Sequence, residues 1–103
     1  MTFSFTITHQ DKNSRARAGI IKTPHGKLET PYLIPVATSG YIRAITPKDI
    51  AKLKIPCLLA NTYHLHCKPS EKIIKKKGGL HKYMKFPKII FTDSGGFQAF
   101  SLG

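Results

Sequence analysis

The sequence predicts an α/β protein with a β-rich opening over residues 1–32 and a β-α-β-α-β order over residues 33–103. Two observations support this fold class. Short apolar runs typical of buried strands occur at residues 32–37, 56–60 and 89–92, and helix start signals stand between them. Alternation of this kind implies a parallel sheet with right-handed crossovers. At 103 residues, the chain is one domain at most.

The opening segment has two features of antiparallel structure. Phe3, Phe5 and Ile7 alternate with polar residues, which predicts a half-buried strand. Two extended runs at residues 18–23 and 28–32 flank a Pro/Gly turn, which predicts a β-hairpin.

The run at residues 32–37 is the first strand that we expect in the core. Its Pro35 is unusual for a central strand, because proline donates no backbone hydrogen bond. Thr38, Ser39 and Gly40 then predict a polar turn.

The first helix is expected from residue 46 to about residue 54. Thr46 is the predicted N-cap, with Pro47 at the first helical position and Asp49 at the third. Ile50 and Leu53 lie three residues apart and are expected to form its buried face.

The second helix is expected after residue 70. The strand at residues 56–60 ends in a segment, 61–64, that we expect to be a loop. Ser70 is then the predicted N-cap, with Glu71 in the first turn. Ile73 and Ile74 should form the apolar stripe, Lys75, Lys76 and Lys77 the C-terminal end, and Gly78 the residue after it.

Asp93 follows the third apolar run and precedes Gly95 and Gly96, where backbone can approach a ligand closely. The other acidic residues have structural explanations in a turn, a hairpin or a first helical turn: Asp11, Glu29, Asp49 and Glu71. Asp93 is therefore the main candidate for chemistry. The alternative is that its carboxylate caps the segment that follows the strand.

Parallel strands place their carboxyl ends at one rim of a sheet. We therefore expect Thr38, the pair Asn61 and Thr62, and the pair Asp93 and Ser94 to gather there. This convergence is the strongest argument from the residues themselves for a functional site.

The chain is strongly basic, with 17 Lys and Arg against 5 Asp and Glu, a formal charge of +12 and a pI near 10.0. Nucleic acid is the first partner to consider, and Arg15 and Arg17 are candidate phosphate contacts, although solvated surface charge is an equal alternative. The sequence has neither a signal-peptide pattern nor an apolar run of membrane-spanning length. A cytoplasmic protein with reduced thiols at Cys57 and Cys67 is expected.

Other site chemistries are weakly supported. Cys57, His64, His66 and Cys67 do not have the spacing of a zinc site, so no metal is assigned within this chain. The Gly-Gly turn lacks the patterns of nucleotide-binding loops, and no nucleophile elbow surrounds Ser94. Phe97 and Phe100 belong either to the core or, for Phe97, to a surface that stacks on a planar base.

Residues 92–102, Thr-Asp-Ser-Gly-Gly-Phe-Gln-Ala-Phe-Ser-Leu, closely resemble the active-site signature of tRNA-guanine transglycosylases, also called queuine tRNA-ribosyltransferases. Residues 61–65 resemble a second signature, and the Gly-Gly loop is similar to that of the bacterial branch. Shorter matches occur in the expected order at residues 14–19, 30–31, 35–36 and 78–81. The resemblance covers essentially the whole chain.

The resemblance implies the amino-terminal part of a (β/α)₈ TIM-type barrel preceded by a small antiparallel sheet. The implied activity replaces guanine at the anticodon wobble position of tRNA with a 7-deazaguanine. Asp93 matches the family's proton acceptor and base contact, and Ser94, Gly95, Gly96 and Phe97 match the adjoining base-binding segment. Asn61 and Thr62 match residues that hold the aspartate when no base is bound.

Family chains are several times longer, and the family's nucleophilic aspartate and zinc ligands lie beyond residue 103. We therefore expect an amino-terminal fragment that is inactive alone, and that ends before a helix can form after the Gly-Gly turn. The implied partners are tRNA, the guanine or 7-deazaguanine base, and a second copy or a missing carboxyl-terminal chain. The alternatives are a basic RNA-binding remnant without catalysis and a truncated, poorly folded product.

Overall fold

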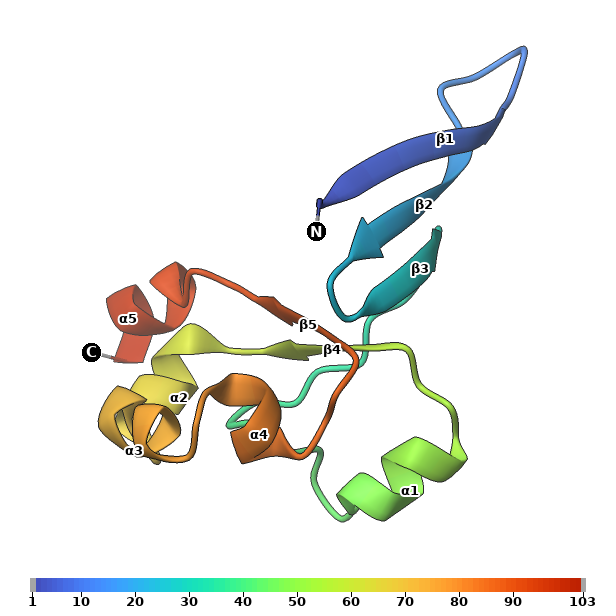
Figure 1. The fold of residues 1–103 in the computed structure, drawn as a ribbon. Coiled ribbons are helices and arrows are strands. Elements are labelled where there is room, and N and C mark those ends of the chain that lie inside the picture. The colour runs from blue at the N-terminus through green and yellow to red at the C-terminus, as the bar shows by residue number, and fades with distance from the viewer. Residues whose placement is uncertain (1, 103) are drawn as a thin grey trace.

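A computed structural model describes residues 2–102, and Met1 and Gly103 lie outside the described residues. The fold is mixed α/β, as predicted (Figure 1). A three-stranded antiparallel sheet precedes a two-stranded parallel sheet. The helices are α1 (Pro47–Lys52), α2 (Thr62–Cys67), α3 (Glu71–Lys76), α4 (Leu80–Met84) and α5 (Gly96–Leu102).

The antiparallel sheet has the order β1 (Ser4–Gln10), β2 (Arg17–Thr23) and β3 (Gly26–Thr30), which confirms the predicted hairpin. The prediction that β1 is half-buried was wrong. Phe3, Phe5 and Ile7 are 70, 45 and 48 % exposed, because no other described element covers the outer end of this sheet (Figure 1).

The inner end of the hairpin is attached to the rest of the molecule at two points. Leu28 on β3 is 2 % exposed and packs with Cys57 and Ile89. In the turn before β3, the His25 ring stacks on His81 of α4, with centroids 3.6 Å apart. Burial, together with the neighbouring His25, lowers the pKa of His81. These contacts set the position of the antiparallel sheet.

The parallel sheet contains β4 (Cys57–Ala60) and β5 (Ile89–Thr92), paired from Cys57 with Ile89 to Ala60 with Thr92. The expected strand at residues 32–37 is not regular. It makes one isolated parallel bridge, Val36 with Leu59, where the Ala37 amide donates to Leu59 and the Leu59 amide donates to Pro35. Pro35 has no N–H, which prevents a continuous ladder.

β4 lies at the centre of the core because its two faces contact different apolar clusters. Leu58 and Ala60 belong to one cluster, and Cys57 belongs to the other. β5 is less enclosed than predicted: Ile89 is buried, but Thr92 is exposed. The larger cluster also contains the buried residues Ala37, Ile50, Leu65, Met84 and Phe86.

Helix α1 begins with the capping box that the sequence predicts. The Thr46 hydroxyl accepts from the Asp49 amide at 3.2 Å, and the Asp49 carboxylate accepts from the Thr46 amide at 3.0 Å. The expected burial of Ile50 is confirmed, whereas Leu53 is 64 % exposed. Leu53 is the C-cap residue, so it lies where the helix ends rather than on its packed face.

The capping box makes the stability of α1 dependent on pH. Hydrogen bonds from Thr46 hold the pKa of Asp49 below its usual 3.8. A lowered pKa stabilises the fold above pH 3.8, and this contribution disappears as the pH falls through the folded-state pKa. Asp49→Asn should therefore lower the urea midpoint at pH 7, and this deficit should shrink progressively as the pH is lowered below 3.8. A deficit that stays constant over this pH range would contradict the assignment.

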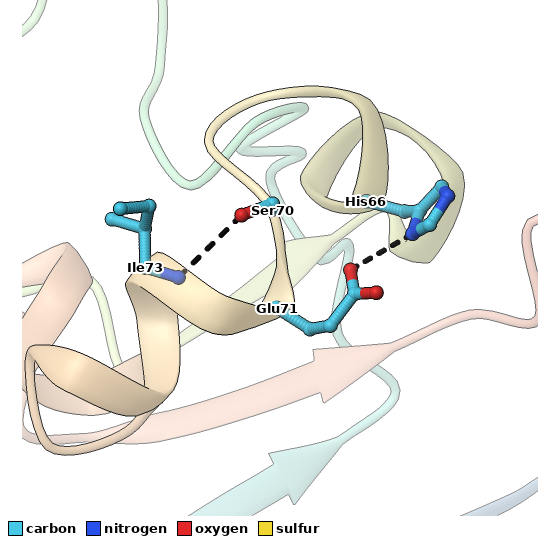
Figure 2. Close-up of polar contacts among 4 residues, drawn as sticks. All are labelled: His66, Ser70, Glu71 and Ile73. Atoms are coloured by element: carbon cyan, nitrogen blue, oxygen red, sulfur yellow. Dashed lines mark hydrogen bonds and ion pairs between the residues drawn. The ribbon is translucent and has the colours of Figure 1, made fainter.

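Helix α3 is capped as predicted, and Figure 2 shows the Ile73 amide donating to Ser70 Oγ. The lysines lie at its C-terminal end, followed by Gly78 at φ 95°. Its apolar stripe is only partly buried, since Ile74 packs against the core but Ile73 is 41 % exposed.

Three expectations about helices were wrong. Residues 61–64 are not a loop, because Asn61 caps α2 through a hydrogen bond from the His64 amide. Helix α4 was not predicted, because its ends lack the usual sequence signals. Its N-cap residue, Gly79, has no side chain to cap the helix, and its C-cap residue in the left-handed conformation is Lys85, not glycine. Helix α5 begins at Gly96, the second glycine of the Gly-Gly turn, where no helix was expected. Phe97 and Phe100 on α5 are 78 and 94 % exposed, which excludes a core role within the described residues.

Candidate functional site

Asp93 follows β5, and its carboxylate is bound by residues that follow the neighbouring strand β4. Asn61 Nδ2 donates to Asp93 Oδ2 at 2.9 Å, and the Thr62 amide donates to Asp93 Oδ1 at 3.0 Å. The Thr62 hydroxyl also donates to the backbone carbonyl of Asp93. We refer to these three residues, Asn61, Thr62 and Asp93, as the carboxylate clamp.

Asn61 has a fixed orientation within the clamp. Its side chain is 4 % exposed, and Oδ1 accepts from the His64 amide at 3.0 Å as the N-cap of α2. With Oδ1 occupied by the helix, Nδ2 points to Asp93. The same amide therefore starts α2 and holds the carboxylate, which connects local helix formation to the geometry of the site.

The predicted convergence of residues at the carboxyl rim is confirmed. Besides the contacts to Asp93, the Asn61 amide donates to the Thr38 carbonyl at 3.3 Å. Three segments separated by more than twenty residues therefore meet through hydrogen bonds. The alternative role for Asp93 was to cap the segment that follows β5. The structure shows a different contact, because the Asp93 carboxylate accepts from the first amide of α2 and not from α5.

The loop after Asp93 turns sharply into α5. Ser94 Oγ accepts from the Gly96 amide at 3.2 Å, and the Gly95 carbonyl accepts from the Ala99 amide at 2.9 Å. Gly95 is buried at φ 68°, while Ser94 and Gly96 are exposed. Phe97 projects from the first turn of α5 and is largely exposed.

The arrangement is suited to binding and proton transfer. The Asp93 side chain is exposed, and each carboxylate oxygen has one protein donor and remaining capacity to accept from a ligand. An exposed aromatic ring follows four residues later in the chain. A planar, hydrogen-bonding ligand could use both features.

Metal ligands do not gather in the described part of the chain. Within residues 2–102, no group of three or more His, Cys, Asp or Glu side chains could hold a metal ion. Cys57 is buried, which raises the pKa of its thiol. His66 lies on α2 and pairs with Glu71 through an Nδ1 to Oε2 distance of 2.8 Å (Figure 2). His64 also lies on α2 and not in the expected loop.

Tyr63 was not predicted as a site residue, yet its backbone supports the site. A Cβ placed on Gly95 would lie 2.6 Å from the Tyr63 amide nitrogen. The presence of Asn at position 61, a preferred N-cap residue, was the signal that could have identified α2 and so this contact.

Among residues 2–102, no helix is long and apolar enough to cross a membrane.

Comparison with known proteins agrees with the motifs. The family model described as queuine tRNA-ribosyltransferase matches residues 11–103. A queuine tRNA-ribosyltransferase of Halothermothrix orenii is 46 % identical over 102 residues, covering 99 % of this chain and 27 % of that protein. A putative queuine tRNA-ribosyltransferase of Archaeoglobus fulgidus is 52 % identical over 103 residues, covering 100 % of this chain and 25 % of that protein.

The similarity extends over nearly the whole chain, and this chain spans about a quarter of the length of the curated relatives that it matches. The match includes both segments of the carboxylate clamp. On this evidence, the chain belongs to the queuine tRNA-ribosyltransferase family.

Proposed function

We propose that this chain is the amino-terminal part of an enzyme that replaces guanine at the tRNA wobble position with a 7-deazaguanine. The observation that carries the proposal is the carboxylate clamp, which presents an exposed Asp93 at the rim of the parallel sheet. The family match supports the same activity.

Base exchange on RNA requires a base extruded from the stack, a nucleophile for the ribose carbon, and a group that moves protons on the two bases. In the proposal, Asp93 is the proton acceptor and also binds the purine. Both of its oxygens are held by Asn61 and Thr62, so the carboxylate is oriented before a ligand arrives. When a base binds, its N–H groups would compete for these oxygens.

The adjoining loop is proposed to bind the base. Ser94, Gly95 and Gly96 turn the backbone away from the strand, and Phe97 follows in an exposed position. An aromatic ring stacks on any base whatever its identity, whereas a carboxylate accepts hydrogen bonds only from bases that present N–H groups in the right place. The two together would select a purine of suitable hydrogen-bonding pattern.

Further parts of the enzyme are proposed to lie outside these residues. They include the rest of a (β/α)₈ barrel, the nucleophilic carboxylate and the ligands of a zinc ion, as the family resemblance implies. The proposed partners are tRNA, the purine base and either a second copy of the chain or a carboxyl-terminal chain. The 103 residues alone are expected to be inactive.

The proposal is tested with a chimera in which residues 1–103 replace the aligned segment of the Halothermothrix orenii relative. Exchange of labelled guanine into tRNA is measured for the chimera and for the 103-residue chain. We expect exchange by the chimera and none by the chain. A chimera that folds and binds tRNA but never exchanges guanine would overturn the proposal.

RNA binding without catalysis is a second candidate, favoured by the charge of +12. If it holds, the 103-residue chain itself should bind tRNA, and six to ten phosphate contacts would weaken binding about 10³- to 10⁵-fold between 50 and 200 mM salt. Replacing Arg15, Arg17 and the three lysines 75–77 by Ala should reduce this dependence. Equal binding by gel shift at both salt concentrations would contradict it.

A further inference from the structure

Gly95 makes the closest approach between the loop after β5 and helix α2. A Cβ at this position would lie 2.6 Å from the Tyr63 amide nitrogen, 2.9 Å from Tyr63 Cβ and 3.2 Å from Tyr63 Cα. Two of these three atoms are backbone, so the neighbour cannot yield by changing a rotamer. Gly95 is also buried at φ 68°, where side chains are rarely accommodated.

The contact joins the two halves of the carboxylate clamp. Tyr63 follows Thr62, whose amide donates to Asp93, and Gly95 lies two residues after Asp93. The Gly95 carbonyl also accepts from the Ala99 amide in the first turn of α5. Any increase in the distance between Gly95 and Tyr63 would therefore pull the Asp93 carboxylate away from its donors.

The neighbouring glycine is under no such constraint. A Cβ on Gly96 would meet only Ser94 Oγ, at 3.3 Å, which is the end of a short side chain and not backbone. Gly79 provides a second comparison, because it has a φ of 105° but a Cβ added there would meet nothing within 4 Å. Gly79 therefore tests the effect of a positive φ without a close contact, and Gly96 tests the effect of an added Cβ without a backbone clash.

We propose that Gly95 is a positioning residue: its missing side chain lets the loop lie against the backbone of Tyr63, and this contact sets the reach of Asp93 to Asn61 and Thr62. The role in catalysis rests on the proposed function, whereas the geometric role does not. In this role Gly95 acts through Asp93, in addition to the base contact proposed for the loop as a whole.

The first test uses NMR of the ¹⁵N-labelled 103-residue chain and needs no enzyme activity. In the wild type we expect a nuclear Overhauser effect between the Gly95 α protons and the Tyr63 amide. The Thr62 amide should also be protected from hydrogen exchange, because it donates to the Asp93 carboxylate. Absence of the Gly95 to Tyr63 effect in the folded wild type would overturn the proposal without any variant.

The variants are Gly95→Ala, Gly96→Ala and Gly79→Ala, with Asp93→Ala as the reference for a lost clamp, because alanine removes both acceptor oxygens. Only Gly95→Ala should resemble Asp93→Ala in losing the hydrogen-exchange protection of the Thr62 amide. In the chimera, Gly95→Ala should lower kcat about 100-fold, the order expected for a displaced catalytic group, with a smaller change in KM.

Hydrogen-exchange protection of the Thr62 amide that is retained in Gly95→Ala, or lost equally in Gly96→Ala, would overturn the positioning role. A rise in KM at unchanged kcat would also overturn it, in favour of direct base contact. A wild-type chimera without base exchange would refute the proposed function. It would not refute the contact between Gly95 and Tyr63, because the measurement on the Thr62 amide tests that contact separately.

Discussion

Asp93→Asn in the chimera should reduce base exchange by about 10²- to 10⁴-fold, the contribution typical of a general acid or base. Asparagine has nearly the same shape, and its Oδ1 can still accept from the Thr62 amide. Its amide nitrogen cannot accept from Asn61 Nδ2 or take a proton from a base. Both the orientation and the chemistry of the group are therefore lost. The measurement is the initial rate of labelled guanine exchange at saturating tRNA.

Glu71→Gln is the matched control for this prediction. Glu71 is also an exposed carboxylate, but it pairs with His66 and so joins α2 to α3 instead of forming part of the clamp. The same loss of one negative charge should leave the exchange rate close to that of the wild type. An active Asp93→Asn chimera, or an equally inactive Glu71→Gln chimera, would reject Asp93 as the proton acceptor.

Leu58→Ala should have the largest effect on stability, a loss of about 2–5 kcal/mol in the free energy of unfolding. Leu58 is 1 % exposed on β4 and packs in the larger apolar cluster, so its truncation leaves a cavity beneath the strand that leads to Asn61. Urea denaturation followed by circular dichroism measures the change.

Leu53→Ala is the control, since the same atoms are removed from a side chain that is 64 % exposed. Its effect should be within about 0.5 kcal/mol, as for most surface substitutions. The helical periodicity of the sequence suggests similar burial for Ile50 and Leu53. Comparable losses from Leu58→Ala and Leu53→Ala would therefore favour that periodicity over the observed packing.

The sequence predicted correctly those local elements that depend on interactions between residues close together in the chain. The capping box of Thr46 and Asp49 and the Ser70 cap each involve residues three apart, so they form whatever surrounds them. The hairpin likewise follows from its turn and flanking strands. The Asp93 site was identified for a related reason: carboxyl ends of parallel strands must share a rim.

Burial was predicted least well. Phe5, Ile73 and Leu53 are apolar residues in suitable patterns, but an apolar pattern buries a side chain only where another element covers it. The radius of gyration of 15.6 Å exceeds the roughly 13 Å of a compact chain of 100 residues, and the antiparallel sheet projects from the body (Figure 1). Its outer end consequently has no described partner.

The sequence by itself determined the order of the strands, the caps of α1 and α3 and the residues that meet at the rim. Only the tertiary structure decided how they meet. The direction of Asn61 Nδ2 depends on α2 occupying its Oδ1, and the place of the loop depends on Gly95 lying against Tyr63. The contacts of Asn61 with Asp93 and of Tyr63 with Gly95 join residues about thirty positions apart, and their geometry is set by packing that local patterns do not encode.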